Sequence, residues 1–154
     1  MARPLDLSTV PVRVGTDYPA PYDGPCQNRR RERLGKAAGL TQLGVNRLTL
    51  APGTWSSQRH WHTHEDELVM VLPGEVVLVS DEGEQTLGPG AVVGFPAGVR
   101  DAHHFQNRSP RDATLLEIGT VAEPVDCAEY PDIDLLYRPT GYFHRDGTAY
   151  PERD

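Results

Sequence analysis

Short apolar runs alternate with glycine- and proline-rich turns through the central part of the chain. Runs of four to eight residues separated by turn signals are typical of β-strands. No stretch of eleven or more residues has the period of an amphipathic helix. The pattern therefore predicts an all-β fold, either a sandwich or a closed barrel. The predicted strands are Val10–Val14, Thr41–Leu50, Leu68–Leu72, Val76–Ser80, Gln85–Leu87, Ala91–Phe95, His103–Asn107 and Ala113–Thr120.

The 154 residues fit one domain, which we divide into three parts. Residues 1–35 are rich in proline and are predicted to be an N-terminal extension. Its edge strand, Val10–Val14, could be lent to a neighbouring subunit. Residues 36–121 form the predicted barrel. Residues 122–154 are predicted to be an irregular tail that packs on the barrel, with tyrosines that cover the core rather than form a binding site.

Three histidines and three acidic residues lie close together at His60, His62, His64, Glu65, Asp66 and Glu67. Alternating residues of a strand point to one face, so His60 and His62 can direct two imidazoles to one point, with His64 in line behind them. A straight strand would turn Glu67 to the other face, but a turn through residues 63–66 would return its carboxylate. Imidazoles and a carboxylate suit a divalent metal.

The alternative is a charged turn whose histidines have no function, which is common for a single exposed histidine. Five of the six histidines, however, fall in the two short groups 60/62/64 and 103/104. This clustering favours the metal site.

The second group offers one further ligand, because neighbouring residues on a strand point to opposite faces. Phe105 and Asn107 share a face with His103, and an apolar Phe105 suits the interior of a barrel. We therefore choose His103 as the third histidine ligand, with His104 as the alternative. Four protein ligands would leave coordination positions open, as in catalytic metal sites.

Acidic residues outnumber lysine and arginine by 22 to 15, which gives a formal net charge of −7. Nucleic acid calls for a positive face, so this balance argues against a nucleic-acid partner. No apolar run approaches the roughly 20 residues that span a membrane. The first residues lack the apolar core of a secretory signal, so we expect a cytoplasmic protein without a membrane partner. We favour free thiols over a disulfide between Cys26 and Cys127.

One basic run, residues 29–33, has the sequence Arg-Arg-Arg-Glu-Arg. It could bind an anionic substrate or a subunit partner. A solvated surface segment is the interpretation that so short a run favours.

Two motifs resemble those of the cupins. The first has His60-Trp61-His62, then four residues, Glu67, then six residues and Gly74; six residues separate Gly53 from His60, where the family has five. The second comprises Gly90, Pro96, Gly98, His103 and Asn107, with four residues rather than two between Gly98 and His103. The run from Arg33 to Tyr150 is similar to a group of small single-domain bacterial cupins.

The resemblance implies a single cupin barrel, a double-stranded β-helix of the jelly-roll type. It implies that His60, His62, Glu67 and His103 hold a divalent metal ion such as Fe, Mn, Ni or Zn. His64 or His104 could act as general acid or base, or could instead be a supporting or surface histidine. We also expect a homodimer.

Cupins include dioxygenases, isomerases, lyases and non-catalytic binders, and the fold does not decide among them. We expect a metal-dependent enzyme that acts on a small polar or anionic molecule. The alternative is a protein that binds a small molecule or sugar without turnover. A purely structural metal is the weakest hypothesis, because strand pairing already closes a barrel.

Overall fold

The structure is a computed structural model that describes residues 3–152, and nearly all of its regular structure is β-sheet. Three short helical segments are present in the described residues: η1 (Leu7–Thr9), η2 (Gly24–Cys26) and α1 (Leu34–Ala37). The strands are β1 (Val12–Val14), β2 (Arg29–Glu32), β3 (Leu43–Leu50), β4 (Trp61–His62), β5 (Glu67–Val71), β6 (Val76–Ser80), β7 (Gly83–Leu87), β8 (Val92–Phe95), β9 (His104–Gln106), β10 (Ala113–Thr120), β11 (Ala128–Tyr130), β12 (Leu135–Arg138) and β13 (Gly141–Phe143).

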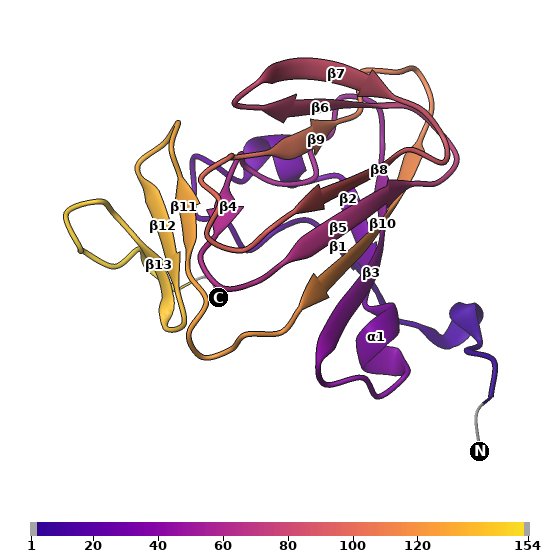
Figure 1. Cartoon of the computed structure of the whole chain (residues 1–154), viewed down its shortest axis with the longest axis horizontal. Coiled ribbons are helices and arrows are strands. Elements are labelled where there is room, and N and C mark those ends of the chain that lie inside the picture. Colours follow the sequence, from indigo (N-terminus) through magenta and orange to yellow (C-terminus); the bar gives the residue numbers. More distant parts are fainter. Residues whose placement is uncertain (1–2, 153–154) are drawn as a thin grey trace.

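Two antiparallel sheets form the barrel. The larger has the order β1-β2-β3-β10-β5-β8, and the smaller has the order β7-β6-β9 (Figure 1). Side chains from both sheets form one apolar core, which consists of Leu48, Leu50, Val69, Val71, Val76, Leu78, Phe105, Ala113 and Leu115. The all-β prediction is confirmed, and each predicted strand is present with bounds shifted by at most two residues.

The inner face of the larger sheet changes character along its strands. Leu48 of β3 pairs with Leu115 of β10, and both are fully buried in the core. Two residues further along the same strands, Asn46 pairs with Glu117. Because side chains alternate between faces, these polar residues share the inner face with the leucines. The barrel therefore has an apolar end and a polar end.

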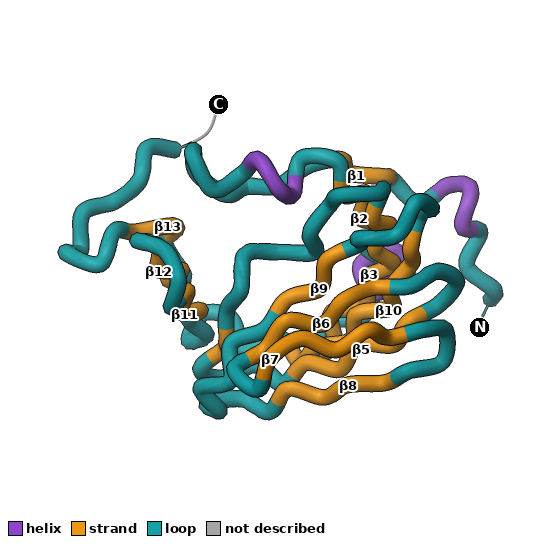
Figure 2. The backbone as a smooth tube through the Cα atoms, turned by 90° about the horizontal axis from the view of Figure 1, so that it is seen from above, coloured by secondary structure: helices purple, strands orange, loops and turns teal. Residues whose placement is uncertain are grey.

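A third sheet, with the order β13-β12-β11-β4, lies to one side of the barrel (Figures 1 and 2). The expectation of an irregular tail is wrong here, since residues 128–143 contain three short strands. Tyr18 and Tyr130 are buried in a second apolar cluster beneath this sheet, and Tyr142 packs against it. The tail tyrosines Tyr130 and Tyr142 thus belong to this second cluster and also line a cavity, so the expectation that they cover the core rather than form a binding site stays a prediction.

The histidine motif does not form a hairpin. We expected the chain to turn directly between the strands on either side of residues 63–66, but β4 pairs with β11, whereas β5 pairs with β10 and β8. The bend lies in the expected place, yet it carries the chain from one sheet into another. His62 is therefore positioned by the C-terminal residues, opposite Ala128.

The N-terminal residues contribute two strands to the larger sheet. The predicted edge strand is present as β1, which pairs with β2 of its own chain. The basic run forms β2, so its interpretation as a solvated surface segment is wrong: Arg29 is only 7% exposed. Alternation along β2 turns the side chains of Arg29 and Arg31 inward.

Two motif residues have structural roles. Gly74 has a φ of +109°, and a Cβ there would lie 2.5 Å from the Cα of Ala113, so a larger residue cannot fit. The amide of Asn107 is fully buried and donates hydrogen bonds to the carbonyl oxygens of Leu50 (2.8 Å) and Arg111 (2.7 Å). These residues close turns of the barrel. Among the described residues, no helix has the length and apolar character needed to cross a membrane.

Candidate metal centre

The two histidine groups meet across a β-bridge. His60 immediately precedes β4 and is bridged to His103, which precedes β9. The His60 amide donates to the His103 carbonyl at 3.1 Å, and the His103 amide donates to the His60 carbonyl at 2.9 Å. Residues 43 positions apart in the sequence are thus held side by side by the backbone.

Each of the three histidines has an acceptor at Nδ1. His60 faces the Gln58 carbonyl at 2.9 Å, His62 faces the Asp126 carboxylate at 2.7 Å, and His103 faces the Asp101 carbonyl at 3.2 Å. A proton on Nδ1 satisfies these acceptors and leaves the lone pair on Nε2. Such outer hydrogen bonds are what fixes the tautomer of metal-binding histidines.

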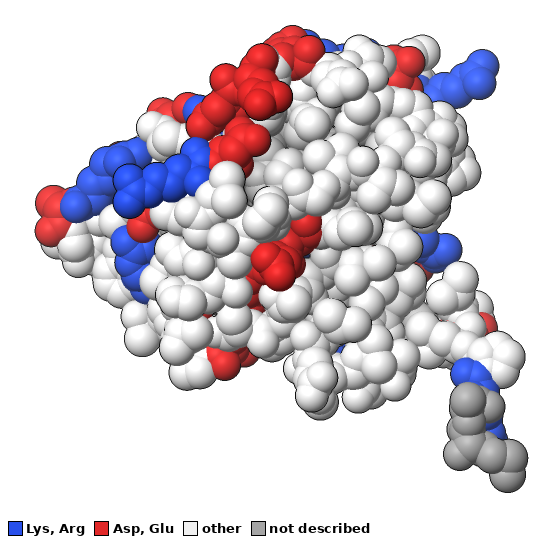
Figure 3. Space-filling model, in the orientation of Figure 1, with Lys and Arg blue, Asp and Glu red and all other residues white. Residues whose placement is uncertain are grey.

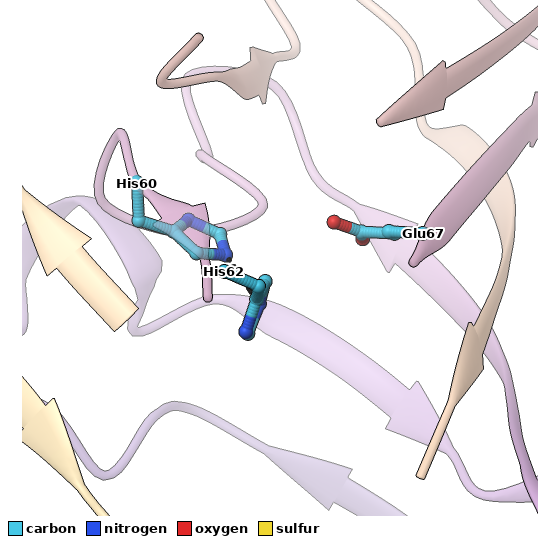
Figure 4. Close-up of side chains that lie close together, drawn as sticks. All are labelled: His60, His62 and Glu67. Atoms are coloured by element: carbon cyan, nitrogen blue, oxygen red, sulfur yellow. Dashed lines mark hydrogen bonds between the residues drawn. The ribbon is translucent and has the colours of Figure 1, made fainter. Parts of the chain in front are cut away.

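The imidazole and carboxylate atoms that could bind a metal are spaced like metal ligands. Nε2 of His60 lies 3.1 Å from Nε2 of His62, and Nε2 of His103 lies 3.0 Å from Oε2 of Glu67. Two ligand atoms about 2.1 Å from one ion and at right angles lie about 3.0 Å apart. Figure 4 shows the Glu67 carboxylate directed toward the His60 and His62 rings. One ligand atom from each of these three residues lies within 4.8 Å of the others. The arrangement fits a divalent cation.

The protonation of the group also suits a metal. Burial lowers the pKa of His60 to about 3, and the neighbouring histidines lower it further in the same direction, so the ring is neutral near pH 7. Burial alone would raise the pKa of Glu67, but in the metal-free protein a hydrogen bond from a proton on Nε2 of His103 and the nearby histidines outweigh it, and the pKa falls; a bound metal ion would take the place of that proton. The carboxylate is therefore ionised. Neutral imidazoles and an ionised carboxylate are the forms that bind metals.

Aromatic rings hold two of the imidazoles in place. Phe95 stacks on His103 with ring centroids 3.4 Å apart, and Tyr130 stacks on His60 with centroids 5.5 Å apart. Tyr130 belongs to β11, so the side sheet helps to fix the geometry of the histidines.

A cavity of about 740 Å³ opens onto the candidate ligands. It is lined by His60, His62, Glu67 and His103 together with polar residues that include Arg31, Asn46 and Glu117. A volume of this size accommodates a small molecule. The candidate ligands can therefore contact a bound molecule rather than being enclosed by protein.

The two histidines predicted as general acid or base lie outside this cavity. His64 is exposed, and its Nδ1 lies 2.7 Å from the Thr63 hydroxyl. His104 is buried on the opposite side of its strand, where its Nδ1 lies 2.9 Å from the Ser57 carbonyl and its ring packs against Trp55. Their catalytic role remains a prediction, and neither ring lies at the candidate metal centre.

Two residues near the centre were not singled out from the sequence, and a third, Arg31, was named only within the basic run, with anion binding as the less favoured alternative. Asp126 is 5% exposed and orients His62, while Glu117 and Arg31 line the cavity. The alternation of the basic run offered a signal for Arg31. Asp126 and Glu117 carry no local signal, because pairings with distant strands position them.

A second acidic group adjoins the first. His62, Glu65 and Asp126 also bring one ligand atom each within 4.8 Å of the others. The protein itself already uses two of these groups, because Glu65 accepts the Ala122 amide at 2.9 Å and Asp126 accepts the His64 amide at 2.9 Å. These contacts explain Glu65 and Asp126 without a metal, so the group of His60, His62 and Glu67 is the stronger candidate, and Asp126 supports His62.

Comparisons with known proteins agree with this architecture. A family model of the cupin domain matches residues 46–119. A sugar phosphate isomerase of the cupin superfamily from Silicibacter pomeroyi is similar over 97% of both chains, with 40% sequence identity and a TM-score of 0.90. A candidate sugar phosphate isomerase from Acidithiobacillus ferrooxidans is similar over 82% of both chains, with 28% identity and a TM-score of 0.71.

More distant similarity extends to the fold alone. The polyketide cyclase RemF from Streptomyces resistomycificus shares 20% identity, with a TM-score of 0.64 over 82% of this chain and 84% of its own. No curated protein matches the chain. The two histidine motifs, the jelly-roll sheets and the relative that is similar along nearly the whole chain agree, and the chain belongs to the cupin superfamily.

Proposed function

We propose that the protein is a metal-dependent isomerase that acts on a small phosphorylated sugar. The observation that carries the proposal is the convergence of His60, His62, Glu67 and His103 on a polar cavity of about 740 Å³. The sugar phosphate isomerase from Silicibacter pomeroyi, similar along 97% of both chains, supports the choice of isomerase over other cupin chemistry.

The three Nε2 atoms and the Glu67 carboxylate would hold the divalent ion. Bound there, the ion would act as a Lewis acid toward substrate oxygens. The Nδ1 hydrogen bonds keep the imidazoles fixed, so little reorganisation accompanies binding. Isomerisation moves a proton from one carbon to its neighbour and exchanges the positions of carbonyl and hydroxyl, with no net oxidation.

The first experiment is elemental analysis of untagged protein purified without added metal and without air. The loaded protein is then incubated with aldose and ketose phosphates, and interconversion is followed by NMR in deuterium oxide. We expect isomerisation with solvent deuterium incorporated at the reacting carbon, and loss of activity in Glu67→Gln.

Other outcomes would select the alternatives. Stoichiometric iron, oxygen uptake and no isomerisation would favour a dioxygenase. Saturable sugar binding without turnover would favour the non-catalytic binder. Either result would contradict the proposed isomerase.

We also propose that the protein forms a homodimer in the cytoplasm. Apolar side chains are exposed on the outer face of the larger sheet, where Leu43 is 43%, Leu68 is 41% and Val92 is 55% exposed. Burial of such side chains against a second copy would remove them from water. Light scattering that shows a monomer at micromolar concentration would contradict the dimer.

A further inference from the structure

The arginines of β2 alternate between the two faces of the sheet. Arg29 pairs with Leu50 and Arg31 pairs with Leu48, and both leucines belong to the apolar core inside the barrel. Arg29 and Arg31 therefore point inward, whereas Arg30 is exposed on the outer face. Two arginines inside a barrel need an explanation, because arginine is rarely buried without partners.

Arg29 is fully explained by the fold. Its Nε donates to the Gly15 carbonyl at 3.0 Å, and its Nη1 and Nη2 donate to the Ser56 carbonyl and the Thr16 hydroxyl. Its guanidinium also lies 5.8 Å from the centroid of the Tyr18 ring. These contacts tie the N-terminal segment to the barrel, so Arg29 has a structural role.

Arg31 is not explained in this way. Its Nε is buried and has no hydrogen-bond partner anywhere in the described part of the chain. Its one ion pair places Nη2 3.5 Å from Oε2 of Glu117, at the long end of the range for such contacts. A buried N–H without an acceptor is unfavourable, and native structures leave few of them. The guanidinium lines the same cavity as the candidate metal ligands.

We propose that Arg31 is the centre of an anion-binding subsite that receives the phosphate group of the substrate. Arg33 and Lys36 also line the cavity and add positive charge near it. A guanidinium offers paired N–H donors that match a phosphate. This inference rests on the proposed function and identifies which end of the substrate lies away from the metal.

The register of the sheet places the subsite at a suitable distance. Arg31 reaches Glu117 of β10, and Glu117 pairs with Val69 of β5, two residues from Glu67. Diagonal neighbours of this kind lie about 7–8 Å apart. One small molecule can therefore contact Arg31 at one end and the metal ligands at the other.

The charge on the rest of the protein does not favour the binding of anions. On the face shown in Figure 3, acidic side chains gather near the top of the view and at its centre, basic side chains lie beside the upper acidic group at the left, and most of the right half is uncharged. The chain as a whole carries a net charge of −7. General attraction of anions by the protein is therefore not expected, and phosphate binding depends on the cavity arginines.

The test is titration of the protein with inorganic phosphate at constant ionic strength, followed by calorimetry, with and without the bound metal. We expect saturable binding that persists in the metal-free protein. Arg31→Gln is expected to weaken it at least about tenfold, as for loss of charge-assisted hydrogen bonds. Arg30→Gln removes the same charge from the same strand on the outer face, and we expect its affinity within about twofold of the wild type.

A second variant keeps the proposal testable if Arg31→Gln fails to fold. Glu117 competes with phosphate for Arg31, because its carboxylate forms the ion pair with that guanidinium. Glu117→Gln is expected to bind phosphate several times more tightly at pH 8. A purely structural role for Arg31 would produce no such gain.

Three results would overturn the subsite: no phosphate binding by the wild type, equal losses in Arg31→Gln and Arg30→Gln, or binding that disappears when the metal is removed. None of these measurements uses a sugar or turnover. A protein that binds phosphate at Arg31 but isomerises nothing would contradict the proposed function and leave the subsite in place.

Discussion

The inner face of the larger sheet is apolar at one end and polar at the other, although β3, β10 and β5 supply both ends. At the apolar end, Leu48, Leu115 and Val71 lie side by side and are fully or almost fully buried. At the polar end, the same three strands carry Asn46, Glu117 and Glu67. Core residues and candidate site residues thus lie at neighbouring positions along the same strands.

The difference shows why the two ends tolerate different changes. The apolar end is close-packed, so removal of atoms leaves a cavity that the surroundings cannot fill. The polar end borders a cavity, and its charged groups face that cavity as well as each other. Substitutions at the apolar end should lower the stability of the fold, and substitutions at the polar end should lower the affinity for a metal or ligand.

The largest effect on stability is expected at the apolar end. Leu115→Ala should reduce the free energy of unfolding by roughly 2–5 kcal/mol, because Leu115 is completely buried. Urea denaturation measures the change. Leu116→Ala, on the half-buried outer face of the same strand, is the matched control and should cost less. Equal losses in the two variants would contradict the division between the faces.

Acid should destabilise the metal-free protein through His60. Its pKa is about 3 in the folded state, against an ordinary value of 6.5, so the unfolded chain binds the proton more readily. The contribution is complete above pH 6.5 and is lost as the pH falls toward 3, at up to about 1.4 kcal/mol per pH unit. Denaturation at several pH values measures it, and His60→Asn should show a smaller slope between these limits.

Glu67→Gln should reduce metal affinity on the order of 100-fold, because it removes the charged ligand. Metal content after dialysis and a competition titration with a chelator measure the loss, and the metal-free variant should keep its fold. Glu65→Gln is the informative control. If Glu65→Gln loses the metal and Glu67→Gln retains it, the ion belongs to the neighbouring group of His62, Glu65 and Asp126.

A smaller effect is expected from Asp126→Asn, which weakens the hydrogen bond that orients His62. Loss of such a partner typically reduces metal affinity about 10- to 100-fold. Asp101→Asn is the control, because His103 uses the backbone carbonyl of Asp101, which the substitution retains. An unchanged metal affinity in Asp126→Asn would show that Asp126 serves the loop rather than the metal.

The smallest effect is expected from His64→Ala. His64 is exposed and does not line the cavity, so metal affinity and turnover should stay within about twofold of the wild type. Steady-state kinetics with a sugar phosphate that the wild type isomerises would measure it. A loss of several orders of magnitude would restore His64 as the general acid or base.

The sequence was informative wherever the decisive pattern was local. Strands such as Val76–Ser80 and Ala113–Thr120 follow from apolar runs between turn residues, and the structure has the same bounds. The spacing of His60 and His62 likewise predicted that their rings share a face. These features need only the two-residue period of a strand.

Predictions from local patterns were wrong where pairing with a distant strand determines the structure. The C-terminal residues lack an apolar period, so they gave no sign of β11, which pairs with β4, or of the two strands that follow it. The basic run has the composition of a surface segment, but β3 holds it in the sheet and turns Arg29 and Arg31 inward. Composition describes a segment by itself, whereas burial depends on what pairs with it.

By itself, the sequence determined the all-β fold, the turn positions and the histidine pairs, because each depends on residues within one strand or turn. The sequence favoured His103 over His104, and the structure places His103 against Glu67; the tertiary structure alone decided that Asp126 supports His62 and that Arg31 borders the same cavity. Those contacts join residues 36 to 86 positions apart, from the 36 between Glu67 and His103 to the 86 between Arg31 and Glu117. Only the register of paired strands brings such residues together, and register is a property of the folded sheet.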